Sequence, residues 1–247
     1  MNDDRTNIFG IRAIIEAIQS GASINKVYLQ KGTRGPLFFE LESLLKSQKI
    51  SNSYVPKEKL DKLSKNQNHQ GAVAAISSVD FYNLNDIIEK TLSKEAAPLF
   101  LILDQVSDVR NFGAIIRTAE CSGVDAIIVQ QTGSAPINAE TIKTSAGAAF
   151  KIPICRESHI KDAIYTLQSH GIKIVAATEK TDQLVYNIDL KQPLAIVMGS
   201  EHKGVNPSVL KIVDCKAKLP LLGKIQSLNV SVACGAFLYE IVRQRIS

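Results

Sequence analysis

Residues 99–130 read LFLILDQVSDVRNFGAIIRTAECSGVDAIIVQ, and this stretch decides the fold class. Its two ends, residues 99–106 and 126–130, are near-continuous apolar runs, which is the pattern of strands buried on both faces of a parallel sheet. Between them, residues 113–122 carry apolar side chains at helical spacing. The stretch is therefore predicted to form a strand–helix–strand unit.

The same alternation continues toward the C-terminus. Residues 172–178 and 194–199 are further apolar runs, and helical patterns occupy residues 139–148 and 158–169. Repeated strand–helix units with short connections predict an α/β fold, an open and mostly parallel sheet with helices on both faces. Ligands of such sheets bind beyond the carboxyl ends of the strands, so polar residues that directly follow strands are the first candidates for a site.

The first part of the chain has a different pattern. Helical patterns occupy residues 8–20 and 36–48, and strand patterns occur at residues 26–30, 53–55 and 72–76. These elements predict a small N-terminal α/β domain over residues 1–78. A polar connector with a short helix, residues 79–97, is expected to join it to a larger domain over residues 98–247.

Composition narrows the class of protein. The chain has 247 residues, of which 45% are hydrophobic and 21% charged, as in globular proteins. No apolar run is long enough to cross a bilayer, and the acidic N-terminus does not resemble a secretory signal. Four dispersed cysteines without a CxxC pair predict reduced thiols, no metal site and a cytoplasmic location. The net charge of +5 permits an anionic partner without requiring one.

The first candidate loop follows residues 99–106. Asn111 is expected at or near the N-cap of the next helix, and Arg117 lies about one and a half turns later. Apolar neighbours suggest that the Arg117 helix is mostly buried, where an unused charge would be costly. The alternative is that Asn111 only caps the helix and that Arg117 is a solvated surface charge.

The second loop, GSEHKGVN, begins at Gly199 directly after a strand. Gly199 allows a close backbone approach, and Glu201 offers a carboxylate at the strand end, although Glu201 could also be a plain surface-turn residue. A phosphate-binding loop requires Lys and then Ser or Thr after its second glycine, whereas Val205 and Asn206 follow here. That class of nucleotide site is excluded.

The third loop lies in KLPLLGKIQSLNVSVACGAFLYEIVRQR, residues 218–245. Its Gln-Ser-Leu-Asn step opens a long helix, so Ser227 and Asn229 stand where free backbone N–H groups meet a ligand. Ser227 as a plain N-cap is the alternative. The sequence lacks GxGxxG after a strand, a GxSxG elbow and an HExxH helix, which removes the commonest α/β enzyme classes.

Together these loops resemble the signature motifs of the SpoU/TrmH family of RNA ribose 2′-O-methyltransferases. The matching segments are NFGAIIRTAECSGV from residue 111, IVMGSEHKGV from residue 196 and LPLLGKIQSLNVSVACGAFLYEIVRQR from residue 219. Their order and spacing are similar to the family's and cover most of residues 99–247. NIFGIRAIIEAI and NHQGAVA, from residues 7 and 68, resemble the substrate-binding domain of the RlmB subgroup, which methylates a guanosine of 23S ribosomal RNA.

The resemblance implies a SPOUT-type fold with a deep trefoil knot, S-adenosylmethionine as cofactor, and a homodimer acting on ribosomal RNA. Alternatives are a transfer RNA 2′-O-methyltransferase and a non-catalytic RNA-binding protein of the same fold. The implied cofactor contacts are Gly199, Leu219, Pro220 and Leu228, with Thr178 as a weaker candidate. The implied catalytic residues are Asn111, Arg117, Glu201, Ser227 and Asn229. The small residues Ala233, Gly235 and Ala236 would permit close packing at a dimer interface.

Two chemical roles are open for Arg117. Its counterpart in the family has been proposed as the general base that removes the proton of the 2′-hydroxyl. Arginine keeps its charge in proteins, however, so Arg117 could instead bind a phosphate and stabilise the developing alkoxide. Asn111 would orient it, and Glu201, Ser227 and Asn229 would shape the pocket.

Overall fold

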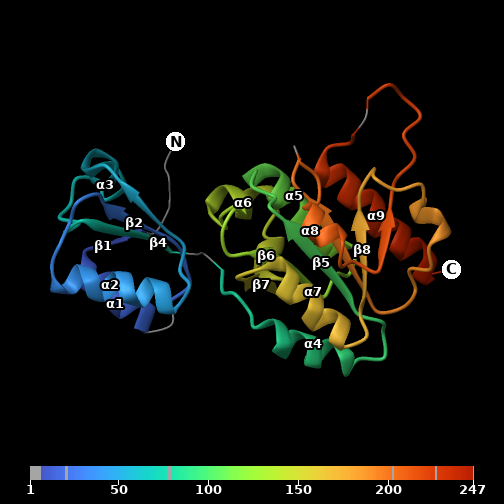
Figure 1. Ribbon diagram of the computed structural model, residues 1–247, viewed down its shortest axis with the longest axis horizontal. Coiled ribbons are helices and arrows are strands. Elements are labelled where there is room, and N and C mark those ends of the chain that lie inside the picture. Colours follow the sequence, from blue (N-terminus) through green and yellow to red (C-terminus); the bar gives the residue numbers. More distant parts are fainter. Residues whose placement is uncertain (1–6, 20–21, 77–78, 202, 226, 247) are drawn as a thin grey trace. The chain divides into compact units, whose positions relative to one another are not determined.

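The computed structural model describes residues 7–19, 22–76, 79–201, 203–225 and 227–246 (Figure 1). The chain divides into two compact units. Unit 1 comprises Met1–Asp80 with Pro136–Ala139, and unit 2 comprises Phe81–Ala135 with Glu140–Ser247. The helix α4 (Leu84–Leu92) lies in the segment expected as a connector, and its buried Leu84, Ile87 and Ile88 pack in the core of unit 2. Much of that segment is therefore part of unit 2.

Unit 1 is a four-stranded mixed sheet between helices. Its elements are β1 (Asn7–Phe9), α1 (Ile11–Gln19), β2 (Ile24–Gln30), α2 (Pro36–Ser47), β3 (Asn52–Val55), α3 (Lys57–Leu63) and β4 (Ala72–Ile76). The strand order is β1-β4-β2-β3, with only β2 and β3 parallel. Side chains of α1 and α2 form one apolar cluster with the sheet, and Leu60 of α3 belongs to a second.

Two features of unit 1 differ from the sequence prediction. The first helix begins at Ile11 rather than residue 8, because residues 7–9 pair antiparallel with β4 and Gly10 turns the chain with φ 95°. The polar stretch after β3, for which no helix was predicted, contains α3. Its seven residues bury one leucine, Leu60, a pattern too short for periodicity to reveal.

Unit 2 is built on a six-stranded, fully parallel sheet. Its strands are β5 (Leu99–Asp104), β6 (Ala126–Gln130), β7 (Ile154–Glu157), β8 (Lys173–Ala177), β9 (Leu194–Gly199) and β10 (Cys215–Ala217), in the order β10-β8-β9-β5-β6-β7. Every residue of β5 and β9 is buried, as their continuous apolar runs predict. The predicted strands at residues 126–130 and 194–199 are confirmed with their bounds.

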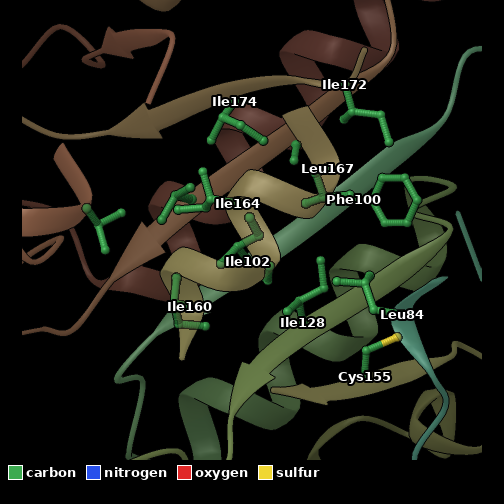
Figure 2. Close-up of a cluster of buried hydrophobic side chains, with 14 of the residues drawn as sticks. Leu84, Phe100, Ile102, Ile128, Cys155, Ile160, Ile164, Leu167, Ile172 and Ile174 are labelled. Carbon is green, nitrogen blue, oxygen red and sulfur yellow. The ribbon is translucent and has the colours of Figure 1, made fainter. Parts of the chain in front are cut away.

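Helices cover both faces of this sheet (Figure 1). The helices of unit 2 are α4, α5 (Val109–Cys121), α6 (Ala139–Thr144), α7 (Ile160–Ser169), α8 (Pro207–Leu210) and α9 (Val230–Ile246), with short 3-10 turns η1 (Ala148–Phe150) and η2 (Val185–Asn187). Figure 2 shows α7 residues such as Ile164 and Leu167 packed on Phe100, Ile102 and Ile128 of one face. The helices α5 and α9 pack together over the other face. The predicted fold class is confirmed, and the carboxyl ends of β5 and β9 lie side by side.

Candidate functional site

A chain of polar side chains links the three predicted loops. The Asn111 amide nitrogen donates a hydrogen bond to the Glu201 carboxylate, and the Asn229 amide nitrogen donates to the Asn111 carbonyl oxygen at 3.0 Å. The three residues come from α5, from the loop after β9 and from the start of α9. Parallel strand ends meet at one edge of the sheet, which is how residues so far apart in sequence converge.

The helix caps differ from the sequence prediction. Asp108, not Asn111, caps α5: its carboxylate accepts the backbone N–H groups of Arg110 and Asn111 at 3.0 and 2.8 Å. Asn111 lies inside the first turn, and its side chain is free to make the contacts just described. At α9, Asn229 rather than Ser227 is the cap, since its carbonyl oxygen accepts the N–H of Ser231 at 2.9 Å.

Gly199 is required by its own loop. A Cβ on Gly199 would overlap the backbone of Gly204 and Val205. The chain folds back here because Ser200 and Gly204 exchange backbone hydrogen bonds of 3.2 and 2.9 Å. The backbone that comes close to Gly199 thus belongs to its own loop, and the contact of Gly199 with a cofactor stays a prediction. This turn carries Glu201, so the missing side chain of Gly199 fixes where the Glu201 carboxylate stands.

A buried carboxylate that sequence reasoning missed supports the same loop. Asp104, the last residue of β5, is 3% exposed, and it accepts the backbone N–H of Asn206 at 2.7 Å. Burial raises the pKa of this carboxyl, while the Asn206 hydrogen bond opposes the rise. The available signal was its position: Asp104 is the first polar residue after the apolar run of β5.

A mostly apolar pocket lies beside the hydrogen-bonded side chains of Asn111, Glu201 and Asn229. Apolar groups from Met198, Leu219, Leu221, Leu228, Ala233 and Phe237 line it, together with the polar Thr178, Glu179, Lys218 and Ser227 and the strand end Ala177. Apolar walls with a few polar groups are typical of sites for small organic ligands. Three predicted cofactor residues, Thr178, Leu219 and Leu228, are therefore brought together with Ser227.

Two predicted cofactor residues do not line this pocket. Pro220 lies between the lining residues Leu219 and Leu221, and Gly199 follows the lining residue Met198. Conversely, Glu179 lines the pocket although the sequence did not single it out. It lies two residues after Ala177, the last residue of β8, so the rule that ligands bind beyond strand ends could have found it.

Arg117 differs most from the prediction. Its side chain is exposed on α5, not held in a buried helix, because the apolar residues around it, Ile115, Ile116 and Ala119, face inward. Within the described ranges, no hydrogen bond or ion pair occupies its guanidinium group. A guanidinium without a partner among the described residues is available to a phosphate or to another subunit.

Metal-binding clusters and membrane-spanning helices are both absent from the described part of the chain. No group of three or more His, Cys, Asp or Glu side chains is arranged there to hold a metal ion. None of the helices described above is long and apolar enough to cross a membrane.

Comparison with known proteins identifies the family. Residues 98–239 match the SpoU rRNA Methylase family, and residues 7–82 match the domain described as RNA 2′-O ribose methyltransferase substrate binding. The chain belongs to the SpoU family. A TrmH family tRNA/rRNA methyltransferase of Bacillus subtilis, YacO, is 33% identical over 99% of this chain and 98% of its own.

Solved structures agree with this assignment. An AdoMet-bound rRNA methyltransferase from Sinorhizobium meliloti is 25% identical, with a TM-score of 0.63 over 98% of this chain and 88% of that chain. The A. aeolicus TrmH/SpoU tRNA modifying enzyme is 31% identical, with a TM-score of 0.56 over 66% of this chain and 82% of its own. This SpoU-family protein is an RNA 2′-O-ribose methyltransferase with S-adenosylmethionine as methyl donor.

The pocket beside β8 and α9 fits that cofactor chemically. Leu219, Leu228 and Phe237 offer apolar surface to the faces of an adenine ring. Glu179 and Thr178, which also line the pocket, have side-chain oxygens of the kind that accept hydrogen bonds from ribose hydroxyls or from an amine. When bound, S-adenosylmethionine supplies an already activated methyl group.

Proposed function

We propose that this enzyme methylates a ribose 2′-hydroxyl of ribosomal RNA, and specifically a guanosine of 23S ribosomal RNA. One observation carries this proposal. Ser227 and Leu228 line the pocket, and the next residue, Asn229, is hydrogen-bonded to Asn111, which in turn is hydrogen-bonded to Glu201. The choice of ribosomal RNA is supported by the matched substrate-binding domain and by the rRNA methyltransferase that aligns with 98% of the chain. The tRNA modifying enzyme aligns with 66%.

The proposed chemistry assigns positioning to the linked amides. Asn111 is held on one side by Glu201 and on the other by Asn229, so its orientation is fixed before substrate binds. Ser227 lines the pocket proposed for the cofactor. Together with Gly199, Pro220 and their neighbours, these groups would hold the ribose and the cofactor in register.

Arg117 is the proposed electrostatic group. Because it stays protonated and exposed, its guanidinium is suited to bind the phosphate beside the target ribose and to stabilise the alkoxide as the proton leaves. A charged arginine is a poor acceptor of that proton, so solvent or a phosphate oxygen is the better acceptor.

The working form proposed is a cytoplasmic homodimer. Val232, Tyr239 and Ile246 are 57%, 54% and 81% exposed, and their spacing of seven residues places them on one face of α9, where a second copy of the chain could cover them. Three small residues were expected at the interface, and two of them already have neighbours within the chain. Ala233 lines the pocket, and a Cβ on Gly235 would lie 3.6 Å from Thr118 of α5. The third, Ala236, is exposed and is therefore the one proposed to contact the second subunit.

The direct experiment is to map 2′-O-methylation in total RNA from cells with and without the protein. We expect one methylated guanosine of 23S ribosomal RNA to disappear and to return with the wild-type gene but not with Arg117→Ala. Loss of a methyl group from transfer RNA instead would overturn the ribosomal assignment. Methylation unchanged in every RNA would favour the non-catalytic RNA-binding alternative.

A further inference from the structure

Unit 1 carries a polar pocket that the methyl-transfer site does not use. It lies between the end of β2 at Gln30, with Thr33 in the turn that follows, and the segment Asn66–Gly71 that leads into β4, and Lys57 and Asp61 of α3 line it as well. Four of its residues carry side-chain amides on exposed positions of that segment: Asn66, Gln67, Asn68 and Gln70. We call the pocket that these four amides line the amide pocket.

Buried hydrogen bonds hold the inner side of the segment. His69 is 6% exposed, and its Nδ1 accepts the backbone N–H of Gly71 at 3.0 Å. The ring proton therefore lies on Nε2, which donates to the Asp61 carboxylate at 3.0 Å. Ser64 is 2% exposed and donates to the backbone carbonyls of Asp61 and Gln67. The backbone that carries the amides is thus fixed from beneath.

The outer side of the segment is strained and unpaired. Asn66 and Gln70 have positive φ values of 61° and 49°, a left-handed conformation that is strained for residues other than glycine. Among the described residues, none of the four amide side chains has a hydrogen-bond partner. Such strain persists where the surrounding structure imposes it, and it concentrates at ligand sites.

The chemistry of the lining selects the ligand. An amide donates and accepts at once, which matches the edge of a nucleobase, as in the paired contacts of Asn or Gln with adenine. Binding dominated by phosphates would need several cations, whereas Lys57 is the one cation among the lining residues. RNA presents free base edges mainly in unpaired loops and bulges.

We propose that the amide pocket binds the base edge of an unpaired nucleotide in the RNA substrate, with His69 positioning the segment. This inference rests on the proposed function in that unit 1 is taken to contact the RNA. It adds which surface makes the contact and that the contact reads bases rather than backbone.

The test uses the full chain and short single-stranded oligonucleotides of adenosine, cytidine or uridine. Binding is followed by fluorescence anisotropy over a range of salt concentrations.

We expect the wild type to bind one of the three oligonucleotides more tightly than the others. The double variant Asn66→Ala/Asn68→Ala should lose about tenfold affinity for that oligonucleotide and keep its salt slope, whereas Lys57→Ala should weaken all three and lower the slope by about one. Gln48→Ala, an exposed amide of unit 1 outside the pocket, should match the wild type.

Equal affinity of the wild type for all three oligonucleotides would overturn the inference, and so would a loss confined to Lys57→Ala. Methyl transfer to unmodified ribosomal RNA separates this result from the proposed function. If the wild type methylates that RNA while Asn66→Ala/Asn68→Ala behaves like Gln48→Ala in both assays, only the amide pocket fails. If the oligonucleotide preference is found but ribosomal RNA is not methylated, only the substrate assignment fails.

Discussion

Replacing Gly199 by alanine tests how the Glu201 loop is held. The new Cβ would sit well inside the 3.0 Å that real Cβ contacts essentially never cross, and the atoms it meets are backbone atoms of Gly204 and Val205. A side chain could swing away, but this backbone cannot move without breaking the two hydrogen bonds between Ser200 and Gly204. The loop must therefore open or the strand end must shift.

The magnitude follows from these contacts. Two backbone hydrogen bonds contribute about 1 kcal/mol each, and overpacking against fixed atoms costs about 1–3 kcal/mol, so unit 2 should lose about 3–5 kcal/mol. The loop also carries Glu201, so opening it separates that carboxylate from Asn111. A displacement of about 1 Å in such a constellation lowers turnover by about 100-fold.

Gly204→Ala is the matched control in the same turn. Nothing lies within 4 Å of its Cβ position, and the cost comes only from its φ of 66°, about 1–2 kcal/mol. Urea unfolding can be followed by hydrogen exchange of the β9 peptide, which reports on unit 2 alone, and methyl transfer can be measured beside it. A Gly199→Ala protein as stable and as active as Gly204→Ala would refute the reasoning.

Further predictions concern individual side chains. Arg117→Ala should abolish methyl transfer while calorimetry shows unchanged S-adenosylmethionine binding, and near-normal turnover would contradict its role. Asp104→Ala should cost about 1–3 kcal/mol by leaving the Asn206 N–H unpaired, whereas Asp104→Asn keeps an acceptor. Because burial raises the pKa of Asp104, its neutral form stabilises the fold at low pH, and stability should fall as pH rises through the raised pKa, a dependence absent from Asp104→Asn. Burial also raises the pKa values of Cys155 and Cys234 to about 12, so both thiols should resist alkylation at neutral pH until urea unfolds the chain, while exposed Cys121 reacts at once. His69→Ala should speed hydrogen exchange at the Gly71 amide, and unchanged exchange would show that His69 does not hold that segment.

Four strands of unit 2, namely β5, β6, β8 and β9, could be predicted because each is a run of mostly apolar residues, whereas the short β7 (ICRE) and β10 (CKA) contain polar residues and were not predicted. β6 and β9 are apolar at nearly every position, and a parallel sheet covered on both faces buries every side chain. β1 could not be predicted in the same way. Its three residues pair with β4, more than sixty positions away, and their local pattern continues that of α1. Nonlocal pairing overrode the helical periodicity.

The sequence by itself determined the residue types of the site and their order after the strands. Tertiary structure alone decided which of them touch. Asn111 meets Glu201 from 90 residues away and Asn229 from 118, because parallel strands bring their carboxyl ends to one edge. It also decided that Asp108 caps α5, that Arg117 faces outward and that Glu179 is one of the residues lining the pocket. Spacing along the sequence determines which residues share one face of a helix. Whether that face is buried or exposed depends on what the helix packs against.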